Sequence, residues 1–121
     1  MKKILIVDDE DDVLKVLGKI LTIEGYDVIK ANNWKDAVES ARKQCPALMI
    51  LDIMMPEKDG GQIVEVLKNY PETKKLPIIF LTGLVTKTEE KYDGHFIGGN
   101  FFIAKPYTKD EVLQAVHKYI K

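Results

Sequence analysis

Short apolar runs alternate along this chain with longer stretches in which apolar residues recur every three or four positions. The runs are Lys3–Val7, Ala47–Leu51, Pro77–Leu81 and Phe101–Ala104. Runs of this length are typical of buried strands, and the longer period is typical of amphipathic helices. The alternation therefore predicts repeated strand–helix units, which means an α/β fold built on a parallel sheet. A shorter run at Asp27–Ala31 has charges on both sides, which predicts an edge strand.

Helical periodicity and capping residues place the connecting helices. We expect helices at Asp11–Glu24, from Asn32 or Asn33 to Gln44, at Gln62–Asn69, at Thr88–Phe96, and from the Thr108/Glu111 capping box onward. The Thr88–Phe96 helix contains Asp93-Gly94, and glycine costs roughly 1 kcal/mol relative to alanine inside a helix. We expect this helix to be short, late-starting or mobile. The pattern contains no linker, which predicts one domain over residues 1–121.

Composition narrows the class of protein. The chain has 121 residues, 45% of them hydrophobic, and a formal net charge of -1. That charge gives no electrostatic reason to expect nucleic-acid binding. The apolar runs are far shorter than the roughly 20 residues that a membrane span needs. With a single cysteine, Cys45, no internal disulfide can form. These features predict a cytoplasmic protein that contacts no membrane.

Polar residues follow four of the predicted strands. Asp8 and Asp9 follow the first, Asp52 the third, Thr82 the fourth and Lys105 the last. The carboxyl ends of parallel strands meet at one edge of the sheet, where ligands of open α/β sheets bind. Clustered carboxylates repel one another unless a hard cation such as Mg²⁺ lies between them. With a hydroxyl and an ammonium nearby, the set suits Mg²⁺-assisted phosphorylation of an aspartate.

Each of these residues also has a simpler interpretation. Asp52 could be a turn or helix-cap aspartate. The acidic segment Asp8–Asp12 could be a helix N-terminus, where negative charge is favourable. Lys105 could be a solvated surface lysine, the usual place for that side chain. The simpler interpretations do not explain why these residues share the mouths of several strands.

Four motifs resemble one known family. They are Val-Asp-Asp-Glu, Leu-Asp-Ile-Met-Met-Pro-Glu-Lys-Asp-Gly, Leu-Thr-Gly and Ala-Lys-Pro-Tyr. Together they are similar to the response-regulator receiver domains of two-component signalling, including the stand-alone chemotaxis type. The resemblance covers essentially the whole chain. It implies a doubly wound, flavodoxin-like sheet of five parallel strands in the order 2-1-3-4-5, with five helices.

The resemblance also implies roles for individual residues. Asp52 would be the phosphoacceptor, which receives a phosphoryl group from a histidine kinase or a phosphotransfer protein. Asp9 and Asp52 would ligate Mg²⁺ directly, Asp8 would help through water, and the backbone carbonyl of Met54 would complete the protein ligands.

Further roles fall at the ends of the last two strands. Thr82 and Lys105 would contact the phosphoryl oxygens, and the Lys105–Pro106 peptide bond would be cis. Thr82 and Phe102 would form the switch, with Thr82 moving inward and the ring repacking. Phe102 can also be read as an ordinary core phenylalanine.

The function implied is a phosphorylatable switch that changes the binding of an unidentified downstream protein, as a monomer or weak dimer. It would not be a conventional enzyme, because it catalyses only its own phosphoryl transfer and dephosphorylation. A dehalogenase-like phosphatase would need a second aspartate at position 54, which is Met54. A flavodoxin would need a Ser/Thr/Gly-rich loop where this chain has Asp8-Asp9-Glu10. The N-terminal receiver of a longer DNA-binding regulator stays open as an alternative.

Overall fold

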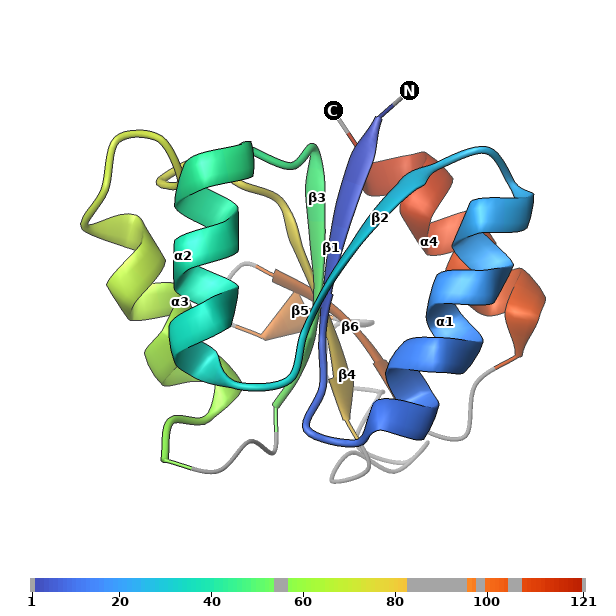
Figure 1. Cartoon of the computed structure of the whole chain (residues 1–121), viewed down its shortest axis with the longest axis horizontal. Coiled ribbons are helices and arrows are strands. Elements are labelled where there is room, and N and C mark those ends of the chain that lie inside the picture. Colours follow the sequence, from blue (N-terminus) through green and yellow to red (C-terminus); the bar gives the residue numbers. More distant parts are fainter. Residues whose placement is uncertain (1, 54–56, 83–95, 98–99, 105–107, 121) are drawn as a thin grey trace.

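Helices cover both faces of a central sheet (Figure 1). The computed structural model describes residues 2–53, 57–82, 96–97, 100–104 and 108–120. In chain order, the elements are β1 (Lys3–Val7), α1 (Asp11–Ile23), β2 (Asp27–Ala31), α2 (Trp34–Gln44), β3 (Leu48–Asp52), α3 (Gly60–Lys68), β4 (Ile78–Thr82), β5 (Phe96–Ile97), β6 (Asn100–Ala104) and α4 (Lys109–Tyr119).

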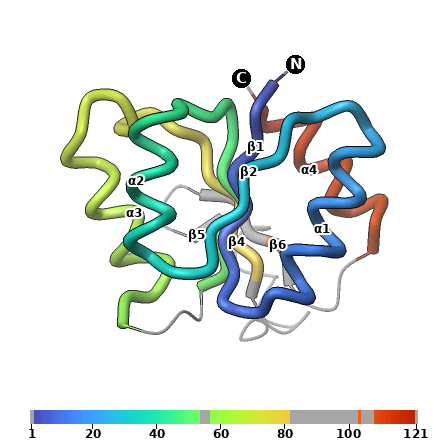
Figure 2. The backbone as a smooth tube through the Cα atoms, viewed as in Figure 1, coloured from blue at the N-terminus to red at the C-terminus, as the bar shows by residue number. Residues whose placement is uncertain are grey.

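The strand order is β2-β1-β3-β4-β6-β5. The first five of these strands are parallel, which confirms the predicted order 2-1-3-4-5 with β6 as the fifth strand. From β1 the chain goes to the edge strand β2 and then to β3 on the other side of β1. Figure 2 follows the backbone through α1 and α2, which connect these strands. The order therefore reverses between β1 and β3. This switch point is where open α/β sheets bind ligands, on the carboxyl side of the strands.

The sheet contains one strand that the sequence did not predict. β5 pairs antiparallel with β6, with Phe96 opposite Phe101 and Ile97 opposite Asn100. Phe96 was expected to end a helix, and its place in a strand corrects that expectation. Antiparallel strands can be joined by two residues, which is the separation of β5 from β6 in the sequence. The rest of the predicted Thr88–Phe96 helix lies outside the described residues.

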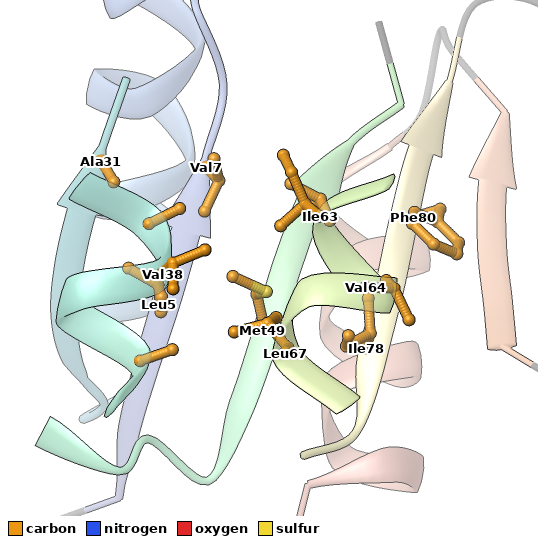
Figure 3. Packing of buried hydrophobic residues seen from close by; sticks show 13 residues of the cluster. Leu5, Val7, Ala31, Val38, Met49, Ile63, Val64, Leu67, Ile78 and Phe80 are labelled. Atoms are coloured by element: carbon orange, nitrogen blue, oxygen red, sulfur yellow. The ribbon is translucent and has the colours of Figure 1, made fainter. Parts of the chain in front are cut away.

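Alternation along the central strands creates two cores, because successive side chains of a strand point to opposite faces. Leu5 and Val7 of β1 lie in the core that α2 and α3 cover, whose labelled members are drawn in Figure 3. Ile4 and Ile6 lie in the core under α1 and α4. All five residues of β3 are buried. With both faces filled by apolar side chains, polar groups gather at the strand ends.

Capping side chains set the starts of α2, α3 and α4, whereas the N-cap of α1, Glu10, makes no side-chain cap hydrogen bond. Asn33, one of two predicted candidates, caps α2 by accepting a hydrogen bond from the backbone N–H of Asp36 at 2.9 Å. The predicted box of Thr108 with Glu111 is confirmed for α4. α3 begins at Gly60, two residues earlier than predicted, because Asp59 caps it.

Two strands end one residue later than predicted. Asp52 and Thr82 are the last residues of β3 and β4, and were expected to follow these strands. The sheet ladder therefore holds the backbone of both residues. Within the described part of the chain, no helix is long and apolar enough to cross a membrane.

Candidate functional site

Three carboxylates meet at the carboxyl ends of β1 and β3. One carboxylate oxygen from each of Asp8, Asp9 and Asp52 lies within 4.8 Å of the other two. The parallel register, with Val7 opposite Leu51, brings the ends of these two strands together. Asp8 is 1% exposed and Asp52 is 4% exposed, whereas Asp9 is exposed. The sequence prediction that these aspartates meet is confirmed by this geometry.

Asp8 is held by its own turn. Its backbone N–H donates to the carbonyl of Ala31 at 3.2 Å, which links it to the end of β2. Its Oδ1 accepts a hydrogen bond from the backbone N–H of Glu10 at 2.9 Å. A turn role therefore accounts for one oxygen of Asp8. It gives no reason for two further carboxylates to lie beside it.

The segment after Asp52 is tied to the sheet at its base. The backbone N–H of Ile53 donates to the carbonyl of Leu81 at 3.0 Å, and that of Gly60 donates to the carbonyl of Ile53 at 2.9 Å. A Cβ on Gly60 would lie 3.0 Å from both the Cα of Ile53 and the ring of Phe80. Glycine therefore lets α3 begin close against the strand that ends in Asp52. The sequence signalled a turn at Asp59-Gly60 but did not reveal this close approach.

The donor chemistry fits a hard divalent cation. Carboxylate oxygens are the ligands that Mg²⁺ prefers, at about 2.0–2.1 Å, and Mg²⁺ usually keeps several of its waters. Two oxygens bound directly to one such ion can be at most about 4.2 Å apart by that measure. A spread of up to 4.8 Å suits an ion that binds part of the set directly and reaches the rest through water. The three carboxylates present therefore fit Mg²⁺.

The other predicted site residues are placed by their backbones or lie outside the described residues. Thr82 ends β4, with Ala104 opposite it in β6. The backbone of Thr82 therefore lies at the same edge of the sheet as Asp52, whose partner in β4 is Leu81. Phe102 is in β6, opposite Phe80. Their switch roles stay predictions.

Met54, Lys105 and Pro106 lie outside the described residues. The carbonyl ligand, the phosphoryl-contacting ammonium and the cis peptide bond predicted there stay predictions.

One residue near this edge was missed by the sequence reasoning. The indole Nε1–H of Trp34, at the start of α2, donates to Oε2 of Glu57 at 3.4 Å. The ammonium of Lys58 lies 4.9 Å from the centre of the same ring. Both partners belong to the connection between β3 and α3. The sequence shows only a single tryptophan beside a predicted helix cap, and this does not predict which residues the tryptophan contacts.

Comparison with known proteins gives a family match over nearly the whole chain. The family described as "Response regulator receiver domain" matches residues 4–117. The alkaline phosphatase synthesis transcriptional regulatory protein PhoP of Bacillus subtilis (strain 168) is 36% identical over 124 residues, covering 99% of this chain and 49% of that protein. The chain thus spans about half the length of the curated relatives it matches.

Solved structures share the fold. The chemotaxis protein CheY4 of Vibrio cholerae is 26% identical with a TM-score of 0.85, and the match covers 99% of each chain. The receiver domain of the sensor histidine kinase PA1611 of Pseudomonas aeruginosa is 24% identical with a TM-score of 0.84, covering 98% of this chain and 96% of that one. That structure has a magnesium ion coordinated in the active-site cleft. The family match, the strand order and the carboxylates at the switch point agree, and the chain belongs to the response regulator receiver domain family.

Proposed function

We propose that this domain is a signalling switch whose Asp52 accepts a phosphoryl group from a histidine kinase or a phosphotransfer protein. The observation that carries the proposal is the gathering of Asp8, Asp9 and Asp52 within 4.8 Å at the switch point of the sheet. Two of these three carboxylates are almost fully buried. Buried like charges are costly to a fold, and such clusters are typical of functional sites.

Mg²⁺ is the cofactor that this donor set favours. Asp9 and Asp52 would hold it directly and Asp8 through water, with the backbone carbonyl of Met54 as a further ligand. When bound, the ion neutralises the carboxylates and the incoming phosphoryl oxygens. The magnesium ion of the PA1611 receiver domain supports this assignment.

Phosphoryl transfer asks mainly for positioning and charge neutralisation. An oxygen of the Asp52 carboxylate attacks the phosphorus of a phosphohistidine in line with the breaking P–N bond. A P–O bond to Asp52 forms, and the imidazole leaves with the electron pair of the P–N bond. The buried strand β3 fixes Asp52 for this attack, because the ladder pairs Asp52 with Leu81 of β4 and the preceding Leu51 with Val7 of β1.

The phosphoryl group then changes the neighbouring strand ends. Thr82 and Lys105 would contact its oxygens, and Phe102 would repack as Thr82 moves inward. The position of Thr82 at the end of β4 and of Phe102 in the next strand, β6, supports this path. The output is altered binding of a protein partner.

The domain would perform no reaction beyond its own phosphorylation and dephosphorylation. The expected monomer or weak dimer, the cytoplasmic location and the absence of nucleic-acid contacts stay predictions.

The test is intact mass after incubation with acetyl phosphate and Mg²⁺. We expect one added phosphoryl group on the wild type and none on Asp52→Asn. Asp12→Asn, which removes an exposed carboxylate of α1, is the matched control and should be modified like the wild type. An adduct on Asp52→Asn, or a folded wild type that takes no phosphoryl group from either acetyl phosphate or phosphorylated histidine kinases, would contradict the proposal.

A further inference from the structure

The chain's single tryptophan joins α2 to the connection that follows Asp52. Trp34 donates its indole N–H to Glu57 at 3.4 Å, and the ammonium of Lys58 lies over the ring, 4.9 Å from its centre. Glu57 and Lys58 follow Asp52 by five and six residues. A side chain of α2 therefore contacts two residues of the connection that follows Asp52.

Trp34 is itself held firmly, so it can restrain the residues that it contacts. It is the first residue of α2, directly after the Asn33 cap. The cap accepts a hydrogen bond from Asp36 N–H at 2.9 Å, which fixes the start of the helix. The half-buried indole packs against the core between α2, α3 and the sheet. One side of the ring is thus anchored in the core while its edge and face contact the β3–α3 connection.

The backbone of Glu57 is in an unusual conformation. Its φ is +70°, in the left-handed region that glycine adopts easily and other residues adopt rarely. Such strain persists where surrounding contacts hold it in place, and it is concentrated at functional segments. Glycine at this position would avoid the strain but would lose the carboxylate that meets Trp34.

The two ends of the same connection are fixed by backbone hydrogen bonds. Ile53 bonds to Leu81 at 3.0 Å and Gly60 bonds to Ile53 at 2.9 Å, which closes the base of the connection. The contacts of Trp34 act on its outer part, at Glu57 and Lys58. Glu57 and Lys58 lead through the Asp59 cap into Gly60, so the part that Trp34 contacts is linked to Ile53, the residue after Asp52.

We propose that Trp34 is a positioning residue for the phosphoryl site. By holding Glu57 and Lys58, it steadies the end of the connection that Gly60 ties to Ile53, the residue after Asp52, and so supports the site for Mg²⁺ and the phosphoryl group. Without the contact, Glu57 and Lys58 must be ordered on binding, and the cost of ordering weakens affinity. This inference rests on the function proposed for Asp52. Trp34 itself touches neither the ion nor the phosphoryl group.

Three substitutions test the contact. Trp34→Phe keeps an aromatic ring but removes the N–H donor. Glu57→Gly removes the acceptor while suiting the left-handed backbone, so it should fold even if the first variant does not. Glu57→Gln keeps an acceptor oxygen and is the conservative rescue. The matched control is Glu72→Gln, because Glu72 also contacts α2, through Arg42 near the far end of that helix.

The readouts are the Kd for Mg²⁺, from calorimetry with magnesium chloride alone, and the rate of phosphorylation by acetyl phosphate. Loss of a hydrogen bond to a charged group should weaken Mg²⁺ binding about three- to tenfold in Trp34→Phe and Glu57→Gly. The phosphorylation rate at subsaturating Mg²⁺ should fall in parallel and recover at saturating Mg²⁺. Glu57→Gln should lie closer to the wild type, and Glu72→Gln should match it.

Mg²⁺ binding also has a spectroscopic signature here. Because Trp34 is the single tryptophan, Mg²⁺ alone should change the intrinsic fluorescence of the wild type. The change should be smaller in Glu57→Gly, in which the ring no longer contacts a carboxylate.

A Kd for Mg²⁺ within twofold of the wild type in both Trp34→Phe and Glu57→Gly would overturn the inference. So would equal losses in Glu72→Gln, which would indicate a general effect of α2. Failure of the proposed function looks different. In that case the wild type itself takes no phosphoryl group, whereas the calorimetric comparison of Mg²⁺ binding still decides whether Trp34 positions the site.

Discussion

Buried polar groups have opposite roles at the carboxyl ends and at the amino ends of the strands, which form two opposite edges of the sheet. At the carboxyl edge, Asp8 and Asp52 are 1% and 4% exposed and share their site with a third carboxylate. At the opposite edge, the connection before β4 contains Thr73, which is 3% exposed. The hydroxyl of Thr73 donates to the carbonyl of Leu67 at 2.5 Å.

This difference separates structural polar groups from functional ones. A buried hydroxyl that donates to a buried carbonyl satisfies both groups and supports the fold. Clustered carboxylates repel one another, which lowers the stability of the fold, and a bound cation would relieve that repulsion. The charge pair Arg42–Glu72, near the edge that holds Thr73, is a third case, because it is partly solvated and therefore weak. Variants at each place should reveal these three kinds of interaction.

The largest effect on stability is expected at Gly60, where α3 begins close to Ile53 and Phe80. A Cβ there would lie 3.0 Å from the Ile53 backbone and from the Phe80 ring. We expect Gly60→Ala to lower the free energy of unfolding by about 1–3 kcal/mol, as overpacking does elsewhere. Urea denaturation measures the change.

Gly61→Ala is the control, because the nearest atom to its added Cβ is Asp59 Oδ1 at 3.4 Å. Alanine at an exposed helical position should leave stability unchanged or raise it by up to about 1 kcal/mol. Equal losses in the two variants would show that a general cost of replacing glycine, and not the close approach at Gly60, is responsible.

Substitution of the buried polar groups should change stability in opposite directions at the two edges. In protein kept free of divalent cations, Asp8→Asn removes one of three clustered charges and keeps the oxygen that accepts from Glu10. We expect it to raise the free energy of unfolding by about 1 kcal/mol, the order of the repulsion between two like charges roughly 4 Å apart in water. Thr73→Val leaves the Leu67 carbonyl without its donor and should lower the free energy of unfolding by about 1–2 kcal/mol.

Thermal and urea unfolding with a chelator present measure both changes. Addition of Mg²⁺ then sharpens the comparison. It should stabilise the wild type and Thr73→Val, because a ligand that binds only the folded state stabilises it. It should stabilise Asp8→Asn much less. A loss of stability in Asp8→Asn with the chelator present would contradict the account of the carboxyl edge.

The smallest effect is expected at Arg42–Glu72. The hydrogen bond from Arg42 lowers the pKa of Glu72 below its ordinary value of 4.5, and the same contact raises the pKa of Arg42. Because the folded-state pKa of Glu72 is the lower one, the contribution is fully present above the unfolded pKa. It is lost as the pH falls through the folded pKa.

The stability difference between the wild type and Glu72→Gln should therefore be small near neutral pH, begin to shrink as the pH falls below 4.5, and disappear once the pH is below the lower, folded-state pKa of Glu72. Added salt should also reduce it, because the pair is exposed to solvent. Urea unfolding at several pH values measures the difference. A difference that grows as the pH falls would contradict the assigned direction.

Much of the fold could be predicted because buried strands have a recognisable pattern. The bounds of β1 and β2 match the predicted Lys3–Val7 and Asp27–Ala31, and the order of the five parallel strands is confirmed. Polar residues directly after apolar runs also predicted that Asp8, Asp9 and Asp52 would meet. This inference worked because parallel strands bring their carboxyl ends to one edge, whatever their separation in sequence.

The misses have local causes. The two-residue strand β5 is too short to show any periodicity. α3 starts earlier than predicted because the Asp59 side chain and Gln62 form a reciprocal cap, which extended the helix across Gly60 and Gly61. The predicted ends of β3 and β4 are one residue too early, because the polarity of Asp52 and Thr82 predicts that they are the first residues beyond their strands.

The sequence alone determined the strand–helix alternation, the parallel sheet and the edge at which three aspartates would gather, because periodicity and chain direction are properties of the linear chain. Tertiary structure decided how closely α3 approaches β4 at Gly60 and which residue Trp34 would meet. Trp34 and Glu57 are 23 positions apart in different elements. Their contact depends on how α2 packs against the sheet and on the left-handed backbone of Glu57, and neither is encoded in a local pattern.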